Sequence, residues 1–272
     1  MIIDGRAIAG DILDEVKASL EGRPAVVRAV AIKPSTATLS YLSIKEESAS
    51  RAGMKLEVVK LSEDATEEDI IAAVTDPGAD AVLVQLPIPE GLDLERVLAA
   101  IPLSQDADVL SSASYTRFEQ GEDGALVPPV AQGVWEILTR HTIDVRGKNV
   151  VVAGRGKLVG KPCAALLAQK GGSVSVVHKG TEHPEELFKN ADIIVSGVGR
   201  SHFITPDMVK EGAVLIDGGT SGTSGAVAGD FHPECAEKAS LFTPVPGGVG
   251  PIAVACLFLN TARLIHERKD LA

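Results

Sequence analysis

The sequence predicts an α/β protein built from parallel sheets in two domains. Short apolar or β-branched runs alternate with segments of helical spacing along most of the 272 residues, which is the pattern of parallel strands covered by helices. A chain that is 45% hydrophobic and 23% charged can bury a substantial core, and its length suits two modest domains.

The first half alternates strand and helix without interruption. Its predicted helices share an amphipathic pattern and cover residues 11–20, 38–51, 66–74 and 92–100. Its predicted strands are apolar or alternating runs at residues 26–32, 54–61 and 81–86. Residues 102–129 contain Gly121, Gly124 and the Pro128-Pro129 pair. We expect this less regular segment to mark the domain boundary.

The second half repeats the alternation. Its predicted helices cover residues 130–141, a stretch after Pro162, residues 184–190 and, at the end, residues 252–268. Its predicted strands cover residues 150–153, 174–177, 192–198 and 213–217. Residues 244–251 (PVPGGVGP) form a rigid proline-glycine loop before the last helix.

Residues 150–181 read as strand, glycine turn, helix and strand. The turn holds Gly154, Arg155 and Gly156, with a third glycine at Gly160, one residue later than in the usual dinucleotide fingerprint. Glycines there let the backbone approach a pyrophosphate, and the following helix directs its amide groups toward it. The pattern predicts a dinucleotide site; the alternative is a turn that needs a positive φ and nothing more.

The residues after the second strand of this unit indicate which dinucleotide is bound. An Asp or Glu at that strand end would bind an unphosphorylated ribose, but the chain has His178 and Lys179, and Arg155 lies in the turn. These cations suit a 2′-phosphate. We therefore expect NADP rather than NAD.

The composition excludes several classes of partner. A net charge of -11, with no clustered Lys and Arg, argues against nucleic acid or an acidic membrane surface. The N-terminus enters acidic helical sequence directly, unlike a targeting peptide, and no apolar run approaches the roughly 18 residues of a membrane helix. Cys163, Cys235 and Cys256 lack metal-ligand spacing. We expect no metal site and a cytoplasmic location.

Four polar residues are candidates for chemistry. Tyr41 and Lys45 stand four apart on one predicted helix and so share a face. Gln85 closes a buried strand before Pro87, where strands deliver functional groups. Asp108 follows Asp106 in a loop. The alternatives are a solvated helix face, a capped strand end and solvated loop acids.

With these residues, the chain resembles the methylenetetrahydrofolate dehydrogenase/cyclohydrolase family. The resemblance covers almost the whole chain and rests on IIDGRAIA, SYLSIKEESASRAG, VQLPIPEGLD, SQDADVL, VRGKNVVVAGRGKLVGKP and TPVPGGVGPIAVACLFLNTARL. It implies a folate-binding catalytic domain at residues 1–129 plus 252–272. It also implies a Rossmann-like, doubly wound NADP-binding domain at residues 130–251, with a cleft between the two and a homodimer.

The resemblance also implies roles for individual residues. The expected catalytic residues are Lys45, Gln85 and Asp108. Lys45 matches the catalytic lysine of the family, Gln85 the glutamine that hydrogen-bonds it, and Asp108 the aspartate that binds the pterin. The expected folate-binding residues are Tyr41, which stacks on the substrate, and Gly250 and Pro251, which border it. The expected cofactor-binding residues are Gly154, Arg155, Gly156, Gly160, His178, Lys179 and Thr220.

The implied reactions are NADP-dependent oxidation of 5,10-methylenetetrahydrofolate and hydrolysis of the methenyl product to 10-formyltetrahydrofolate. The chain departs from the family pattern at Gly156 and Lys179, where the family usually has Ser. It also has PPVA at residues 128–131, where the family usually has Pro-Cys-Thr-Pro, and Val109 where the family usually has Gly. These changes put the balance of the two activities in question. The alternatives are a dehydrogenase-only member, a shikimate-type NADP dehydrogenase and a dinucleotide-binding sensor without activity.

Overall fold

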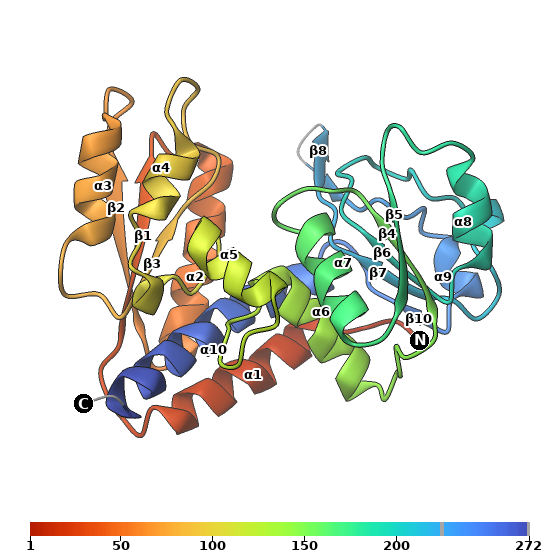
Figure 1. Ribbon diagram of the computed structural model, residues 1–272, viewed down its shortest axis with the longest axis horizontal. Coiled ribbons are helices and arrows are strands. Elements are labelled where there is room, and N and C mark those ends of the chain that lie inside the picture. Colours follow the sequence, from red (N-terminus) through yellow and green to blue (C-terminus); the bar gives the residue numbers. More distant parts are fainter. Residues whose placement is uncertain (224–225, 271–272) are drawn as a thin grey trace. The chain divides into compact units, whose positions relative to one another are not determined.

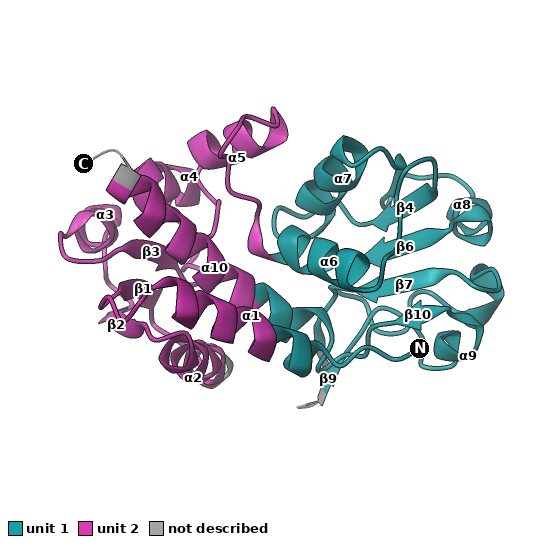
Figure 2. Cartoon of the chain, turned by 90° about the horizontal axis from the view of Figure 1, so that it is seen from below, with its two compact units in different colours: residues 1–9, 130–253 teal, residues 10–129, 254–272 magenta. Residues whose placement is uncertain are grey.

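The computed structural model describes residues 1–223 and 226–270, and the chain divides into two compact units (Figure 2). Unit 1 comprises residues 1–9 and 130–253, and unit 2 comprises residues 10–129 and 254–272. Both boundaries between the units near the chain ends fall inside a helix, α1 (Gly5–Ser19) and α10 (Val249–Asp270).

The first nine residues belong to unit 1, whereas the sequence-based division assigns them to the other domain. The backbone N–H of Ile3 donates to the carbonyl of Phe242 at 2.9 Å, and that of Gly5 donates to Gly247 at 2.9 Å. A pairing between the two ends of the chain leaves no local pattern in the sequence, because its partners lie more than two hundred residues apart.

Unit 2 contains a parallel sheet in the order β2-β1-β3. The strands are β1 (Val26–Ile32), β2 (Lys55–Leu61) and β3 (Ala81–Val84). β1 is central, and all of its residues but the first are buried. β2 begins with Lys55 opposite Val26, and β3 begins with Ala81 opposite Val27.

The helices of unit 2 agree with the predicted ones except at their ends and in one segment (Figure 1). Besides the parts of α1 and α10 in this unit, they are α2 (Thr36–Arg51), α3 (Glu67–Thr75), α4 (Leu94–Ala99) and α5 (Ser112–Glu119), with the short 3₁₀ helix η1 (Leu103–Gln105). α2 begins two residues before the predicted start because the Ser35 side chain caps it, accepting from Thr38 N at 3.1 Å.

α5 lies in residues 102–129, which the sequence analysis expects to be irregular; that expectation is wrong for this part. The Ser111 hydroxyl caps the helix by accepting from Ser114 N at 3.2 Å, and Phe118, 2% exposed, anchors it in the core. One cap and one large apolar residue in eight positions leave too weak a periodicity to detect.

Unit 1 contains a five-stranded parallel sheet in the order β10-β7-β6-β4-β5. The strands are β4 (Asn149–Ala153), β5 (Ser173–Val177), β6 (Ile193–Ser196), β7 (Val214–Asp217) and β10 (Leu241–Phe242). The antiparallel pair β8 (Ser221–Thr223) and β9 (Ala226–Ala228) forms a separate ribbon. β8, β9 and β10 are absent from the predictions, since each has only two or three residues.

Helices cover both faces of this sheet, with α7 and α8 on opposite sides of β4 (Figure 1). The helices are α6 (Pro129–Arg140), α7 (Gly160–Gln169), α8 (Pro184–Asn190) and α9 (Cys235–Lys238), with η2 (Pro206–Met208). One core cluster joins strand residues such as Val151 and Ile194 to Phe188 of α8 and Cys235 of α9.

Each sheet has one point where the chain reverses its direction of strand addition. In unit 1 the chain runs from β4 to β5 on one side and then to β6 on the other; in unit 2 it runs from β1 to β2 and then to β3. Ligands of open parallel sheets bind outside the carboxyl ends of strands at such switch points. The rule directs attention to the ends of β4 and β6 in unit 1 and of β1 and β3 in unit 2.

α10 is the one helix among the described residues that is long and apolar enough to cross a membrane, over Val249–Lys269. No uninterrupted apolar run of that length occurs, but the mean hydropathy of the window reaches 1.4. In this structure 61% of the window is buried inside the protein. Its apolar side chains, Phe258 and Ile265 among them, are therefore accounted for as core residues.

Candidate active site

Lys45 and Gln85 meet at the switch point of unit 2. Gln85 directly follows β3, and its N–H donates to the Val30 carbonyl of β1 at 2.8 Å. Its side-chain Nε2 donates to the Leu86 carbonyl at 3.0 Å, which leaves Oε1 to accept from Lys45 Nζ at 2.9 Å. The hydrogen bond expected between these two side chains is present, and it fixes the amine at the sheet edge where ligands bind.

Lys45 and Asp108 influence each other's ionisation. Burial lowers the pKa of the Lys45 amine, and the negative charge of Asp108 opposes this shift. Burial also raises the pKa of the Asp108 carboxyl, and the positive charge of Lys45 offsets part of that rise. A partly buried amine with a lowered pKa is suited to accept and return a proton.

The loop that carries Asp108 is held on both sides of that residue. The buried Asp106 carboxylate accepts from the N–H groups of Leu110 at 3.3 Å and Ser111 at 3.0 Å. From α10, the fully buried Asn260 donates from Nδ2 to the Ala107 carbonyl at 2.9 Å. The position of Asp108 is thus determined by buried polar contacts.

Val109, where the family resemblance leads one to expect glycine, has a φ of 55° and is 1% exposed. A β-branched residue in this left-handed region is sterically strained. Such strain persists only where the surrounding structure enforces it, and it is characteristic of functional sites. The loop therefore keeps the backbone form that glycine would adopt freely, even though this chain has valine.

Tyr41 lies one turn before Lys45 on α2 and is 48% exposed. Ile44, three residues after Tyr41 and on the same side of the helix, is 47% exposed. The two exposed side chains lie on α2 within one turn of Lys45. Ile44 is not among the site residues predicted from the sequence, although its i, i+3 spacing from Tyr41 was a usable signal.

The glycine turn of unit 1 lies at the other switch point. Gly154 has a φ of 103°, and a Cβ added to it would lie 2.7 Å from the Gly197 carbonyl oxygen, in the loop after β6. A Cβ at Gly160, the first residue of α7, would lie 2.2 Å from the Gly154 carbonyl oxygen. These two glycines are required by packing between the turn, the helix and the neighbouring strand.

Gly156 differs, because nothing lies within 4 Å of a Cβ placed there. The space above the turn is open, and the N-terminus of the ten-residue helix α7 follows. This combination fits a dinucleotide pyrophosphate. Arg155, Lys179 and Thr220 are exposed at the carboxyl ends of β4, β5 and β7.

His178 is also exposed, but its ring has a local partner. The ring Nδ1 accepts from the Gly180 N–H at 3.0 Å, and the backbone N–H of His178 donates to the Thr181 hydroxyl at 3.0 Å. The imidazole therefore shapes the turn after β5. Gly250 and Pro251 lie in the first turn of α10, within unit 1, so Lys45, Gln85, Asp108 and Tyr41 are grouped in unit 2 and the remaining candidates in unit 1.

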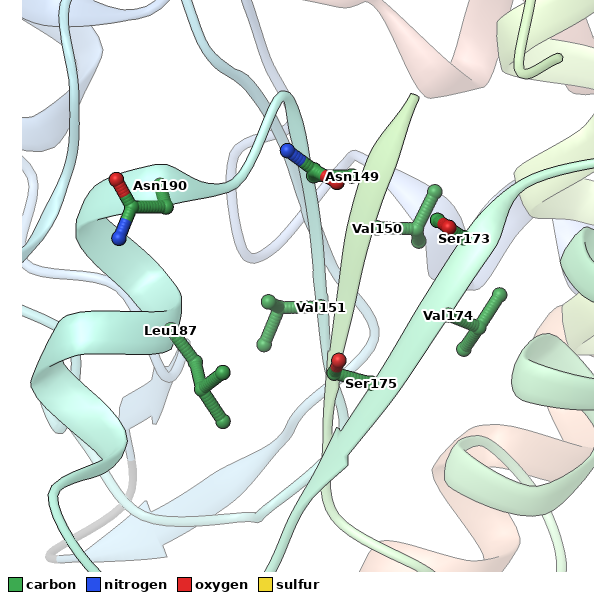
Figure 3. Close-up of a pocket in the computed structure, with 8 residues that line it drawn as sticks. All are labelled: Asn149, Val150, Val151, Ser173, Val174, Ser175, Leu187 and Asn190. Atoms are coloured by element: carbon green, nitrogen blue, oxygen red, sulfur yellow. The ribbon is translucent and has the colours of Figure 1, made fainter. Parts of the chain in front are cut away.

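A pocket in unit 1 lies away from these candidate residues (Figure 3). It opens at the amino ends of β4 and β5, beside α8, and is lined by Asn149, Val150, Val151, Ser173, Val174, Ser175, Leu187 and Asn190. Ligands of parallel sheets bind at the carboxyl ends. The pocket is therefore not the dinucleotide site.

Comparison with family models decides the relationship of the chain to known proteins. Residues 3–108 match the catalytic domain of tetrahydrofolate dehydrogenase/cyclohydrolase, and residues 128–269 match its NAD(P)-binding domain. The chain belongs to the tetrahydrofolate dehydrogenase/cyclohydrolase family. The family and the enzyme class expected from the sequence are confirmed.

Relatives match over the full length of the chain. The bifunctional protein FolD of Lactobacillus delbrueckii subsp. bulgaricus is 36% identical over 281 residues, covering 99% of each chain. The Campylobacter jejuni FolD structure is 30% identical, with a TM-score of 0.94, and covers 98% of this chain and 99% of its own. The Trypanosoma brucei enzyme, solved with NADP and an inhibitor, is 30% identical with a TM-score of 0.93, covering 100% and 99%.

The expected fold, two α/β domains with parallel sheets, is confirmed by these structures. Shikimate 5-dehydrogenase from Thermus thermophilus is 17% identical with a TM-score of 0.52 and covers 90% of this chain and 99% of its own. That likeness shows a shared fold alone. The shikimate-type alternative therefore has no support beyond architecture.

Proposed function

We propose that this chain oxidises 5,10-methylenetetrahydrofolate to the methenyl compound with NADP, and hydrolyses that compound to 10-formyltetrahydrofolate. The observation that carries the proposal is the Lys45–Gln85 hydrogen bond of 2.9 Å at the switch point of the unit 2 sheet. A lysine held by a neutral amide, with burial lowering its pKa, is equipped for proton transfer. Binding of a ligand alone would not require that arrangement.

In the hydrolysis, water attacks the carbon of the methenyl bridge, and the neutral Lys45 amine accepts a proton from that water. The resulting ammonium returns this proton to the ring nitrogen as the carbon–nitrogen bond breaks, and the second proton of the water is released to solvent as the formyl C=O forms. Gln85 keeps the amine in place throughout. The cationic substrate itself favours the neutral form of the lysine.

Three further residues hold the folate in this proposal. The carboxylate of Asp108 accepts from the N–H donors on one edge of the pterin, which present the two-pronged geometry that a carboxylate matches. Tyr41 stacks on an aromatic part of the substrate and Ile44 extends that apolar surface. Unit 2 is therefore assigned as the folate-binding unit.

For the oxidation, the residues of unit 1 hold the dinucleotide. When bound, NADP supplies the acceptor for the hydride of the methylene bridge. The open space at Gly156 and the N-terminus of α7 receive the pyrophosphate, and Arg155 and Lys179 pair with the 2′-phosphate. Equal efficiency with NADP and NAD in steady-state kinetics would remove the basis for this preference.

The test of the function is a spectrophotometric assay of methylenetetrahydrofolate with NADP or NAD, together with the purified methenyl compound alone. Reduction of NADP and accelerated loss of the methenyl signal are expected. Reduction without accelerated loss would identify a dehydrogenase-only enzyme, and NADP binding without either reaction would identify a sensor.

The Lys45→Met variant should retain its fold and lose hydrolysis of the methenyl compound by a factor on the order of a hundred or more. Lys60→Met, which changes an exposed lysine of β2 in the same unit, is the control. Undiminished hydrolysis by Lys45→Met would refute the assigned role.

We propose further that the protein is a cytoplasmic homodimer. β5 is an edge strand of the unit 1 sheet, and Val176 on it is 39% exposed; an exposed apolar edge favours pairing with another chain. The three cysteines are free and buried, which suits a reducing compartment. Sedimentation at micromolar concentration should give twice the mass of one chain, and a monomer alone would contradict the dimer.

A further inference from the structure

One buried carboxylate holds the loop that follows β6. Asp230 is fully buried. It accepts hydrogen bonds from the Ser196 hydroxyl at 2.7 Å and from the backbone N–H groups of Val198 at 2.7 Å, Gly199 at 3.3 Å and Arg200 at 2.7 Å. Four donors converge on one side chain, and charge-assisted bonds of this length are the strong ones.

The loop lies where the sheet topology directs a ligand. β6 and β4 are neighbours on the two sides of the unit 1 switch point. The Gly197 carbonyl at the end of β6 packs against Gly154, so closely that a Cβ there would lie 2.7 Å from the oxygen. Residues 197–200 and the glycine turn thus lie side by side at the switch point, and hydrogen bonds to Asp230 hold residues 198–200.

The loop after β7 leaves room for the Asp230 carboxylate because it has a glycine beside it. A Cβ on Gly219, in the loop after β7, would lie 2.1 Å from Asp230 Oδ2. A second buried carboxylate, Asp217, accepts from Gly219 N at 2.9 Å and from Phe231 N at 3.0 Å, and so ties the neighbouring loop to the segment that carries Asp230. The two acids connect three loops at one edge of the sheet.

Two neighbouring buried carboxylates are costly for stability. Burial, aided by the charge of Asp230, raises the pKa of Asp217 to about 7. Apolar residues of similar volume would avoid the desolvation of both groups. The position therefore serves something other than packing, and what it achieves structurally is a defined conformation of residues 198–200.

We propose that Asp230 is a positioning residue for dinucleotide binding, which holds residues 198–200 in the conformation that receives the cofactor before the cofactor arrives. The inference rests on the proposed function in one respect, that unit 1 binds the dinucleotide. It assigns to Asp230 no contact with the cofactor and no part in the hydrolysis, whose residues lie in unit 2.

Asp230→Asn tests the proposal with little change in volume. An amide has one acceptor oxygen, so its NH₂ group must face at least one of the N–H donors that the carboxylate now satisfies. We expect the Kd and the KM for NADP to rise by about tenfold or more. Hydrolysis of the methenyl compound, measured without NADP, should stay within about twofold of the unmodified protein.

Asp192→Asn is the matched control in the same unit. Asp192 accepts from Asn149 N at 2.8 Å and from Lys210 Nζ at 2.5 Å, at the amino edge of the sheet. The substitution perturbs two hydrogen bonds, compared with four at Asp230, so it should lower the melting temperature without changing the Kd for NADP. Equal effects of the two variants on that Kd would mean that Asp230 acts only through stability and would overturn the proposal.

Hydrogen exchange of the unmodified protein provides a test that does not depend on a variant folding. The N–H groups of Val198, Gly199 and Arg200 should be protected before NADP is added, although Val198 is 40% exposed. Exchange at the rate of an open loop would overturn the proposal, as would an unchanged Kd in a folded Asp230→Asn protein. If the unmodified protein binds no NADP, the proposed function fails instead, and the protection of these amides still reports separately on the loop.

Discussion

At the scale of single residues, the site combines a lysine and an aspartate whose ionisation is coupled. Burial lowers the pKa of Lys45, while the charge of Asp108 raises it. The rate of hydrolysis should therefore rise with pH as the neutral amine forms. The pH at which the rate rises depends on the pKa of Lys45 and therefore also on the charge of Asp108.

Asp108→Asn removes the negative charge that stabilises the ammonium form of Lys45. The pKa of Lys45 should fall further, and the ascending limb of kcat for methenyl hydrolysis should move to lower pH. Measurement of kcat at saturating substrate separates this effect from weaker folate binding, which should appear in KM. A limb that stays in place, or moves to higher pH, would contradict the coupling.

Val109 allows a test of backbone strain beside Asp108. Glycine is usually less stabilising than alanine by roughly 0.5–1 kcal/mol. At a φ of 55° the order should reverse, because alanine retains the left-handed strain and glycine does not. In urea denaturation, the unfolding free energy of the Val109→Gly variant should be higher than that of the Val109→Ala variant by about 1 kcal/mol. The usual order would show that the loop relaxes out of this conformation.

At the scale of elements, α10 holds two segments near Asp108 through the side chain of Asn260. The Asn260 Nδ2 donates to the Ala107 carbonyl and to the Val127 carbonyl, both at 2.9 Å. Its Oδ1 is buried and has no hydrogen-bond partner among the described residues, which is a cost. A polar side chain kept in a core helix in spite of that cost indicates a role in holding the loop.

Asn260→Ala should leave the two carbonyls without their donor, lowering the unfolding free energy by on the order of 2 kcal/mol. The KM for folate should rise, because Asp108 loses a support, while the Kd for NADP stays unchanged. Thr261→Ala, which removes a buried hydroxyl that donates to the Leu257 carbonyl within α10, is the control and should leave KM unaffected. Equal KM values for both variants would argue against the tether.

At the scale of the whole molecule, Asp217 gives stability an unusual dependence on pH. Its folded pKa of about 7 lies above its ordinary value of 3.8. Between these values the folded state binds more protons than the unfolded state, so stability falls as pH rises toward 7 and then levels off. Acidic groups with salt bridges, such as Asp192, have a lowered pKa and act in the opposite sense.

Comparison with Asp217→Asn isolates this contribution, since the variant cannot titrate there. The unfolding free energy of the unmodified protein relative to the variant should fall by on the order of 2 kcal/mol between about pH 5 and about pH 8. Urea denaturation at several pH values measures it. A constant difference across that range would show that the carboxyl titrates normally.

The amino-acid sequence by itself determined the alternation of strands and helices, the glycine turn, and the candidate residues for chemistry. These features are local: periodicity sets each element, and Tyr41 and Lys45 share a helix face whatever surrounds them. Only the tertiary structure decided which distant groups meet. The Lys45–Gln85 bond, the strain at Val109, the hold of Asn260 on the Asp108 loop and the hold of Asp230 on residues 198–200 join segments that no periodicity connects. These contacts form because a polar group that is buried away from water needs a hydrogen-bond partner, and the tertiary fold determines which group is close enough to be that partner.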